Sequence, residues 1–285
     1  MRRMWWVVLA FVACTKEAPT PTPNHDGSGS KKPAPIEIGS SVALPEVARD
    51  GYEPAVEGLA VVITKTGIVV EGKAIVSIQN GAVDPSEKEG GTLGVLIPRL
   101  RAFTEQLVQQ PSARGKPILI VADRDTPYRT LLEVVYSMKQ AGPRAFSIIA
   151  RSKGDIVALP LTERERTVEA ASPPESAGSA RSADAPLGMF VSITRRGIQV
   201  WSVSGREGTI GAPRRTIELN DPARLDAAVG ELRRELADVA AKHTAPEDRQ
   251  IVIQAEMGTP LQVFAAVAGA AHASFPAITL SSGFE

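Results

Sequence analysis

Residues 116–150 read KPILIVADRDTPYRTLLEVVYSMKQAGPRAFSIIA, and this stretch decides the fold. It opens with an apolar run of strand length, from Ile118 to Val121, and closes with a second such run, from Phe146 to Ile149. An acidic turn and an amphipathic helical pattern lie between the two runs. A strand, a helix and a strand in this order, joined by connections this short, indicate a compact parallel βαβ unit.

A second copy of this pattern lies further along the chain. Residues 62–70 (VITKTGIVV) match residues 192–200 (SITRRGIQV), at an offset of 130 residues. Residues 118–127 (ILIVADRDTP) match residues 251–260 (IVIQAEMGTP), at an offset of 133 residues. Two separate similarities with nearly the same offset indicate an internal duplication.

Each repeat is expected to begin with a β-hairpin and to continue with two helices. Thr126 and Thr259, which each precede a proline, are expected to cap the second helix of their repeat through the side-chain hydroxyl. Residues 155–159 predict an extra edge strand in the first repeat alone. We therefore expect an α+β fold of two tandem two-layer modules, each a small mixed sheet with two helices on one face. Apolar residues at three-to-four spacing place the helices at about residues 93–110, 127–141, 221–242 and 260–273.

The N-terminus has the pattern of an export signal. Met1 is followed by two arginines, and residues 4–13 are apolar or small. Because a bilayer span needs about 20 apolar residues, this segment fits a signal peptide better than a transmembrane helix. Residues 11–14 (FVAC) resemble a bacterial lipobox, which predicts cleavage before Cys14 and acylation of that residue. An ordinary signal peptide with an incidental cysteine and an uncleaved anchor are the alternatives.

Low-complexity segments divide the rest of the chain. They are rich in Pro, Ser, Gly, Ala and charged residues, so they cannot bury enough apolar surface to fold. The expected plan is a signal peptide with a lipobox-like end over residues 1–14, a disordered Pro/Ser/Gly-rich tether over 15–44, a first domain over 45–162, a linker over 163–186 and a second domain over 187–285.

Composition excludes several function classes. The 32 basic and 32 acidic residues balance, which argues against nucleic-acid binding driven by net positive charge. Cys14 is the only cysteine and the three histidines are far apart, so we expect no intrachain disulfide, no metal site and no cofactor. Common catalytic motifs such as Gly-x-Ser-x-Gly and the phosphate-binding loop are absent from the sequence, which predicts that the protein is not an enzyme.

The stretch that opens this section resembles the extracytoplasmic domain of the ExbD/TolR biopolymer-transport family. The resemblance covers about residues 59–161, and the second repeat shows it only weakly. In that family a proton-carrying aspartate lies in a transmembrane helix. No acidic residue lies between Met1 and Cys14, so this activity does not transfer. The positions that match the family pattern are Ala122, Asp123, Pro127, Tyr128, Lys139, Ala141 and Gly142.

The resemblance implies a non-catalytic, lipid-anchored binding or scaffold protein on the periplasmic face of a bacterial membrane. Thr15 after the cysteine favours the outer membrane. The implied partners are an ExbB/TolQ-like channel, other ExbD/TolR-like proteins or TonB/TolA-like proteins, and the family also predicts a homodimer. The alternative is an envelope structural protein that binds peptidoglycan independently of any motor.

Four residues of the first repeat are candidates for partner contact: Asp123, Asp125, Pro127 and Tyr128. The alternative is structural, since the two aspartates could simply place negative charge at a helix N-terminus and the tyrosine could pack on the helix. Tyr128 corresponds to Leu261 in the second repeat and Asp125 to Gly258, so a contact site of this kind would belong to the first repeat only.

Overall fold

The computed structural model describes residues 42–48, 57–90, 95–143, 145–161, 186–219 and 221–281. All of them belong to one compact unit, Ala34–Glu285. Cys14, the expected signal peptide and nearly all of the expected tether and linker lie outside the described residues.

The first repeat forms a seven-stranded mixed sheet in the order β4-β3-β2-β1-β5-β6-β7. The three central strands β1, β5 and β6 are parallel, and the remaining neighbours pair antiparallel. Its strands are β1 (Leu59–Ile63), β2 (Gly67–Val70), β3 (Lys73–Gln79), β4 (Ala82–Val83), β5 (Ile118–Ala122), β6 (Phe146–Ser152) and β7 (Asp155–Leu161).

The second repeat forms a five-stranded mixed sheet in the order β12-β9-β8-β13-β14, with parallel strands β8, β13 and β14. The strands β8, β13 and β14 therefore repeat the arrangement of β1, β5 and β6. A separate two-stranded hairpin, β10-β11, follows β9. The strands are β8 (Met189–Thr194), β9 (Gly197–Ser202), β10 (Gly208–Thr209), β11 (Ala212–Pro213), β12 (Arg215–Ile217), β13 (Gln250–Ala255) and β14 (Ala277–Ser281).

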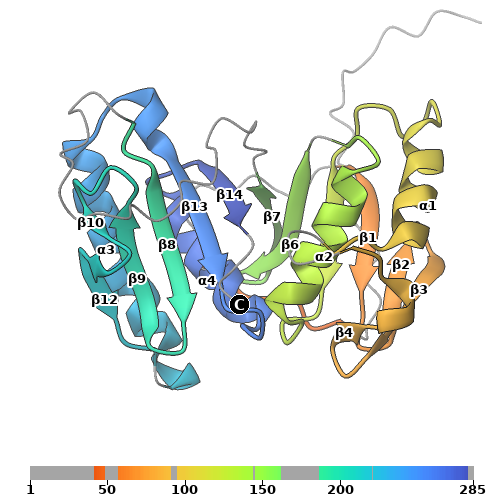
Figure 1. Cartoon of the computed structure of the whole chain (residues 1–285), viewed down its shortest axis with the longest axis horizontal. Helices are drawn as coiled ribbons and strands as arrows, with labels where there is room; N and C mark the ends of the chain where they lie inside the picture. Colours follow the sequence, from red (N-terminus) through yellow and green to blue (C-terminus); the bar gives the residue numbers. More distant parts are fainter. Residues whose placement is uncertain are drawn as a thin grey trace, which may run out of the picture. The chain divides into compact units, whose positions relative to one another are not determined.

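Two helices accompany each sheet, and Figure 1 shows α1 and α2 against the first sheet and α3 and α4 against the second. The expected α+β class is confirmed. Three short 3₁₀ turns complete the described elements: η1 (Pro85–Glu87), η2 (Pro222–Arg224) and η3 (Pro246–Arg249). The helices are α1 (Pro98–Val108), α2 (Tyr128–Lys139), α3 (Leu225–Lys242) and α4 (Leu261–His272).

The core lies between each sheet and its helices. Alternate strand residues such as Val61 and Ile120 point to the same side of the first sheet, where Leu100 of α1 and Leu131 of α2 share one buried cluster with them. Helix α4 is apolar almost all round, and nearly all of its side chains are buried. This explains how so hydrophobic a helix is stable in water.

The opposite face of the first sheet is covered by the extended residues 42–48. Leu44 lies in a small buried cluster with Leu119, Val121 and Ile149, whose side chains point away from the helices. Strand β5 is therefore buried on both faces, as its unbroken apolar sequence predicts.

Equivalent turns open the two repeats. The Thr64 hydroxyl donates to the carbonyl of Gly67 (3.0 Å), and the Thr194 hydroxyl donates to the carbonyl of Gly197 (3.2 Å). Both glycines are required by close backbone approach, because a Cβ atom at Gly67 would overlap the carbonyl of Val76 and one at Gly197 would overlap the carbonyl of Ile217.

Candidate functional site

The helices α2 and α4 meet at their N-termini, where the two repeats are joined. Pro127 and Pro260 form an antiparallel bridge. The N–H of Tyr128 donates to the carbonyl of Thr259 (2.8 Å), and the N–H of Leu261 donates to the carbonyl of Thr126 (2.8 Å). These two hydrogen bonds are equivalent, because each joins positions related by the 133-residue offset.

A second equivalent pair of hydrogen bonds continues the junction. The N–H of Arg129 donates to the carbonyl of Met257 (3.0 Å), and the N–H of Gln262 donates to the carbonyl of Arg124 (2.8 Å). The first N–H groups of a helix have no acceptor within the helix itself. Each repeat therefore supplies the acceptors for the first turn of the other repeat's helix, which gives the junction a local pseudo-two-fold symmetry.

The expected hydroxyl caps are wrong. Neither α2 nor α4 has a side-chain cap, and the residues at the cap positions are the prolines themselves, Pro127 and Pro260. The main-chain carbonyls of Thr126 and Thr259 act as acceptors for the opposite repeat instead. Because carbonyls across the junction satisfy the helix N–H groups, the threonine hydroxyls are not needed there.

Tyr128 lies inside this junction and is fully buried. Its hydroxyl donates to the carbonyl of Ser281 (2.7 Å) and lies 3.3 Å from that of Ile253, and its ring stacks on Phe264 with centroids 5.1 Å apart. Burial disfavours the phenolate and raises the pKa of Tyr128 well above its ordinary value, although the carbonyl of Ser281 acts in the opposite direction. All these contacts are with the second repeat.

The two predicted aspartates lie on the loop before α2. Asp123 is buried; its carboxylate accepts from the N–H of Asp125 (3.0 Å) and from that of Ala43 (3.3 Å). Asp125 is exposed, and Pro127 is half-buried in the bridge to Pro260. Of the four predicted contact residues, Asp125 presents its side chain to solvent, while Asp123 and Tyr128 make contacts within the chain.

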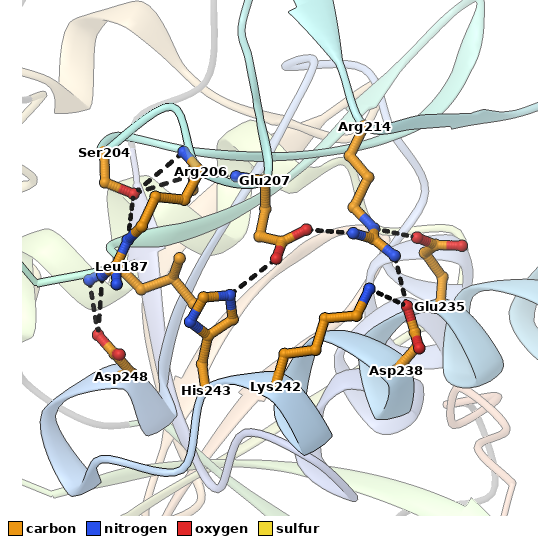
Figure 2. Close-up of polar contacts among 11 residues, drawn as sticks. Leu187, Ser204, Arg206, Glu207, Arg214, Glu235, Asp238, Lys242, His243 and Asp248 are labelled. Atoms are coloured by element: carbon orange, nitrogen blue, oxygen red, sulfur yellow. Dashed lines mark hydrogen bonds and ion pairs between the residues drawn. The ribbon is translucent and has the colours of Figure 1, made fainter. Parts of the chain in front are cut away.

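A charged cluster in the second repeat was not predicted (Figure 2). Glu207, just before β10, is only 6% exposed. Its carboxylate pairs with the guanidinium of Arg214 and lies 2.7 Å from Nε2 of His243. Its N–H donates to the hydroxyl of Ser202 (2.9 Å). Burial alone would raise the pKa of Glu207, but hydrogen bonds from His243 and Arg214 outweigh it and lower the pKa.

The cluster extends to helix α3. Arg214 also pairs with Glu235 and with Asp238, and Asp238 accepts from Nζ of Lys242 (2.9 Å). The acidic and basic groups largely neutralise one another, and they join the segment around β10 and β11 to the C-terminal half of α3. We assign the cluster a structural role. Sequence reasoning could not identify it, because Glu207 and Arg214 lie in a polar connection without periodicity.

A smaller ion-pair group supports the first repeat. The carboxylate of Glu133 on α2 is buried and lies 2.7 Å from Nζ of Lys88 and 2.8 Å from Nε of Arg129. Arg129 thus contributes its side chain to this group and its N–H to the junction. Among the residues that the structure describes, no group of His, Cys, Asp and Glu is arranged to hold a metal ion. The helices within the same ranges include none that is long and apolar enough to cross a membrane.

Comparisons with protein-family models, with curated proteins and with solved structures find no match for this chain. The resemblance to the ExbD/TolR family therefore stays a prediction from the sequence, and the site is interpreted from its geometry.

Proposed function

We propose that this protein is a non-catalytic, lipid-anchored scaffold of the bacterial cell envelope that works beside an ExbB/TolQ-like motor. The observation that supports this proposal best is the reciprocal junction between the repeats. In the family that the first repeat resembles, the corresponding domain pairs with a second copy of itself. Here one chain contains both members of a pair, and backbone hydrogen bonds run in both directions between them.

The junction also indicates which of the predicted residues is available to a partner. Asp125 is exposed beside the equally exposed Arg124, whereas Tyr128 is enclosed between the repeats. We therefore propose that the loop of residues 124–125 contacts the partner protein. In this proposal Tyr128 acts indirectly, because it holds that loop and α2 against the second repeat.

Site-specific cross-linking in intact membranes tests this function. A photo-reactive amino acid at position 125 should capture an ExbB-, ExbD- or TonB-like protein, while the same probe at Tyr136, an exposed position on α2, should capture much less. If neither position captures such a protein in cells that carry the motor, the scaffold proposal is wrong. Co-sedimentation with purified cell wall, without cross-linking to a motor component, would instead support the peptidoglycan-binding alternative.

The proposed anchor is tested independently of the partner. Replacement Cys14→Ser removes the only cysteine, so the protein should no longer be acylated and should leave the membrane fraction. Metabolic labelling with a fatty-acid analogue, followed by fractionation, measures both effects. Persistent membrane association of unlabelled Cys14→Ser would show that the protein is held by something other than a lipid.

A further inference from the structure

The face of the second sheet that points away from α3 and α4 differs chemically from the corresponding face of the first sheet. In the first sheet, a row of aligned residues on β2, β1 and β5 is formed by Val69, Val62 and Val121. The equivalent row on β9, β8 and β13 is formed by Gln199, Ser192 and Gln254. Every one of the three valines is thus replaced by an amide or hydroxyl side chain.

The adjacent row of the second sheet is aromatic and apolar. Trp201, Phe190, Val252 and Thr279 are aligned across β9, β8, β13 and β14. The rings of Trp201 and Phe190 stack with their centroids 4.4 Å apart and their planes at 18°, and both side chains are partly exposed. We call these two rows together the outer face of the second sheet.

Hydrogen bonds hold the two rows in a fixed arrangement. The indole N–H of Trp201 donates to the hydroxyl of Ser192 (2.9 Å), and the amide of Gln254 donates to the same hydroxyl (2.7 Å). A small hollow lies next to the aromatic row and is lined in part by Gly188, Val252 and Thr279. A rigid aromatic pair beside a hollow, with fixed polar groups along one side, has the composition of a binding surface.

The first repeat shows what this face of the fold holds. Residues 42–48 cross it in an extended conformation, and Pro45 lies within that segment. Main-chain groups fix the segment: the N–H of Arg151 donates to the carbonyl of Pro45 (2.8 Å), and the N–H of Val47 donates to the carbonyl of Arg151 (2.9 Å). Leu44 fills the apolar row beneath it.

We propose that the outer face of the second sheet docks an extended, uncharged, proline-containing peptide segment of a partner protein. This inference rests on the proposed scaffold function and names a second contact of the scaffold. Proline rings pack on aromatic side chains, and an extended proline-containing chain leaves its carbonyls free to accept hydrogen bonds. Trp201 and Phe190 supply the aromatic surface, and the amide of Gln199 supplies a donor beside it.

The neutral character of the face selects against charged occupants. The two rows contain no charged side chain, so a charged peptide would lose hydration there without gaining an ion pair. The chain's own expected linker, residues 163–186, is rich in Glu and Arg. We therefore assign the face to a partner segment rather than to the linker.

Peptide binding to the purified full chain tests the proposal. The probe is a fluorescein-labelled twelve-residue peptide of alternating Ala and Pro, and a peptide of alternating Gly and Ser is the control probe. Fluorescence anisotropy should show saturable binding of the Ala-Pro peptide only. Trp201→Ala should weaken it about tenfold, since tryptophan is the commonest dominant contact residue at interfaces. Tyr136→Ala, which removes an exposed aromatic from the first repeat, should leave it unchanged.

A second variant guards against loss of folding in Trp201→Ala. Gln199→Glu adds a negative charge beside the aromatic row and keeps the size of the side chain, so it should weaken binding several-fold without changing the melting temperature. Equal binding of both peptides, or full affinity in Gln199→Glu, would overturn the proposal.

Two further outcomes would reassign the face. Binding of chitohexaose that depends on Trp201, without peptide binding, would make it a glycan site. Peptide binding that occurs only after deletion of residues 163–181 would make the linker its occupant. Either result overturns the docking proposal alone, because the scaffold function is tested at position 125 on the other repeat.

Discussion

Tyr128 shows how one side chain can connect two repeats. It begins α2 in the first repeat, yet its hydroxyl bonds to Ser281 and its ring stacks on Phe264, both in the second. We predict that Tyr128→Phe lowers the free energy of unfolding by about 1–2 kcal/mol, because the buried carbonyl of Ser281 loses its donor while the ring contact stays.

Urea denaturation measures this loss. The matched control is Tyr136→Phe, which removes the same hydroxyl from a tyrosine that is 37% exposed and should change the stability by less than about 0.5 kcal/mol. Equal effects of the two substitutions would show that the Tyr128 hydroxyl contributes nothing specific to the junction.

Glu207 makes the stability of the second repeat depend on pH. Its pKa in the folded protein lies below the ordinary value of 4.5, so its contribution is present above that value and is lost as the pH falls through the folded pKa. We predict that Glu207→Gln lowers the free energy of unfolding by about 2 kcal/mol at neutral pH, because a charge-assisted hydrogen bond is removed. The difference from the wild type should shrink below about pH 4.5.

Unfolding measured from neutral to acid pH tests this expectation. Glu57 is the control, because its pKa is also lowered, by Lys116, but its carboxylate is fully exposed and the ion pair is screened by water. Glu57→Gln should therefore have little effect at any pH. A stability difference for Glu207→Gln that stays constant down to pH 3 would contradict the proposed linkage.

The helices α2 and α4 depend on each other at the scale of the element. Proline is normally tolerated in the first turn of a helix, because the N–H it lacks has no acceptor within the helix. In α2 the N–H of Arg129 does have an acceptor, the carbonyl of Met257. We predict that Arg129→Pro destabilises the protein by about 1–3 kcal/mol more than the same change at an ordinary helix start.

Arg99 provides that ordinary helix start. It occupies the second position of α1, is exposed, and pairs with Glu87 much as Arg129 pairs with Glu133. Arg99→Pro therefore removes a comparable surface ion pair but no hydrogen bond between the repeats. Similar melting temperatures for the two proline variants would mean that the junction bond is not important for stability.

Periodicity predicted the existence of all four helices but not how they begin. The first was expected from about residue 93 and begins at Pro98, and the third was expected from about residue 221, where the 3₁₀ turn η2 precedes α3. Apolar spacing reports which residues face the sheet, and it does not report where the chain first turns. Asp221 still acts as a local cap, since its carboxylate accepts from the N–H of Ala223 (2.9 Å).

The two repeats should behave as one body at the scale of the whole molecule. Core residues of both belong to one buried cluster, and four backbone hydrogen bonds join α2 and α4 to the opposite repeat. We predict that a protease site inserted at residue 175 can be cut without separating the halves, which should still elute together in size-exclusion chromatography.

A cut protein with Tyr128→Ala is the informative comparison. Loss of the stacked ring and of its hydroxyl should weaken the association of the two halves, so that they separate on dilution. If the wild-type halves already separate after cutting, the junction is not strong enough to hold the pair together, and the single-chain pair loses its support.

The sequence alone specifies the local content of this protein. Apolar runs mark the buried strands, three-to-four spacing marks the helices, and the 130- and 133-residue offsets mark the duplication. Each of these depends on side chains close together in the chain or repeated along it, so a reader of the sequence can find them. The same holds for Asp123 and Tyr128, which stand out by residue type even though their contacts do not.

Only the tertiary structure decides what those residues contact. The acceptors for the first turn of α2 are main-chain carbonyls of the second repeat, and a carbonyl is present at every position of any sequence. Glu207 likewise meets His243 only because β10 and the end of α3 are brought together. The junction and the charged cluster depend on distances between segments far apart in the chain, and those distances exist only once the chain has folded.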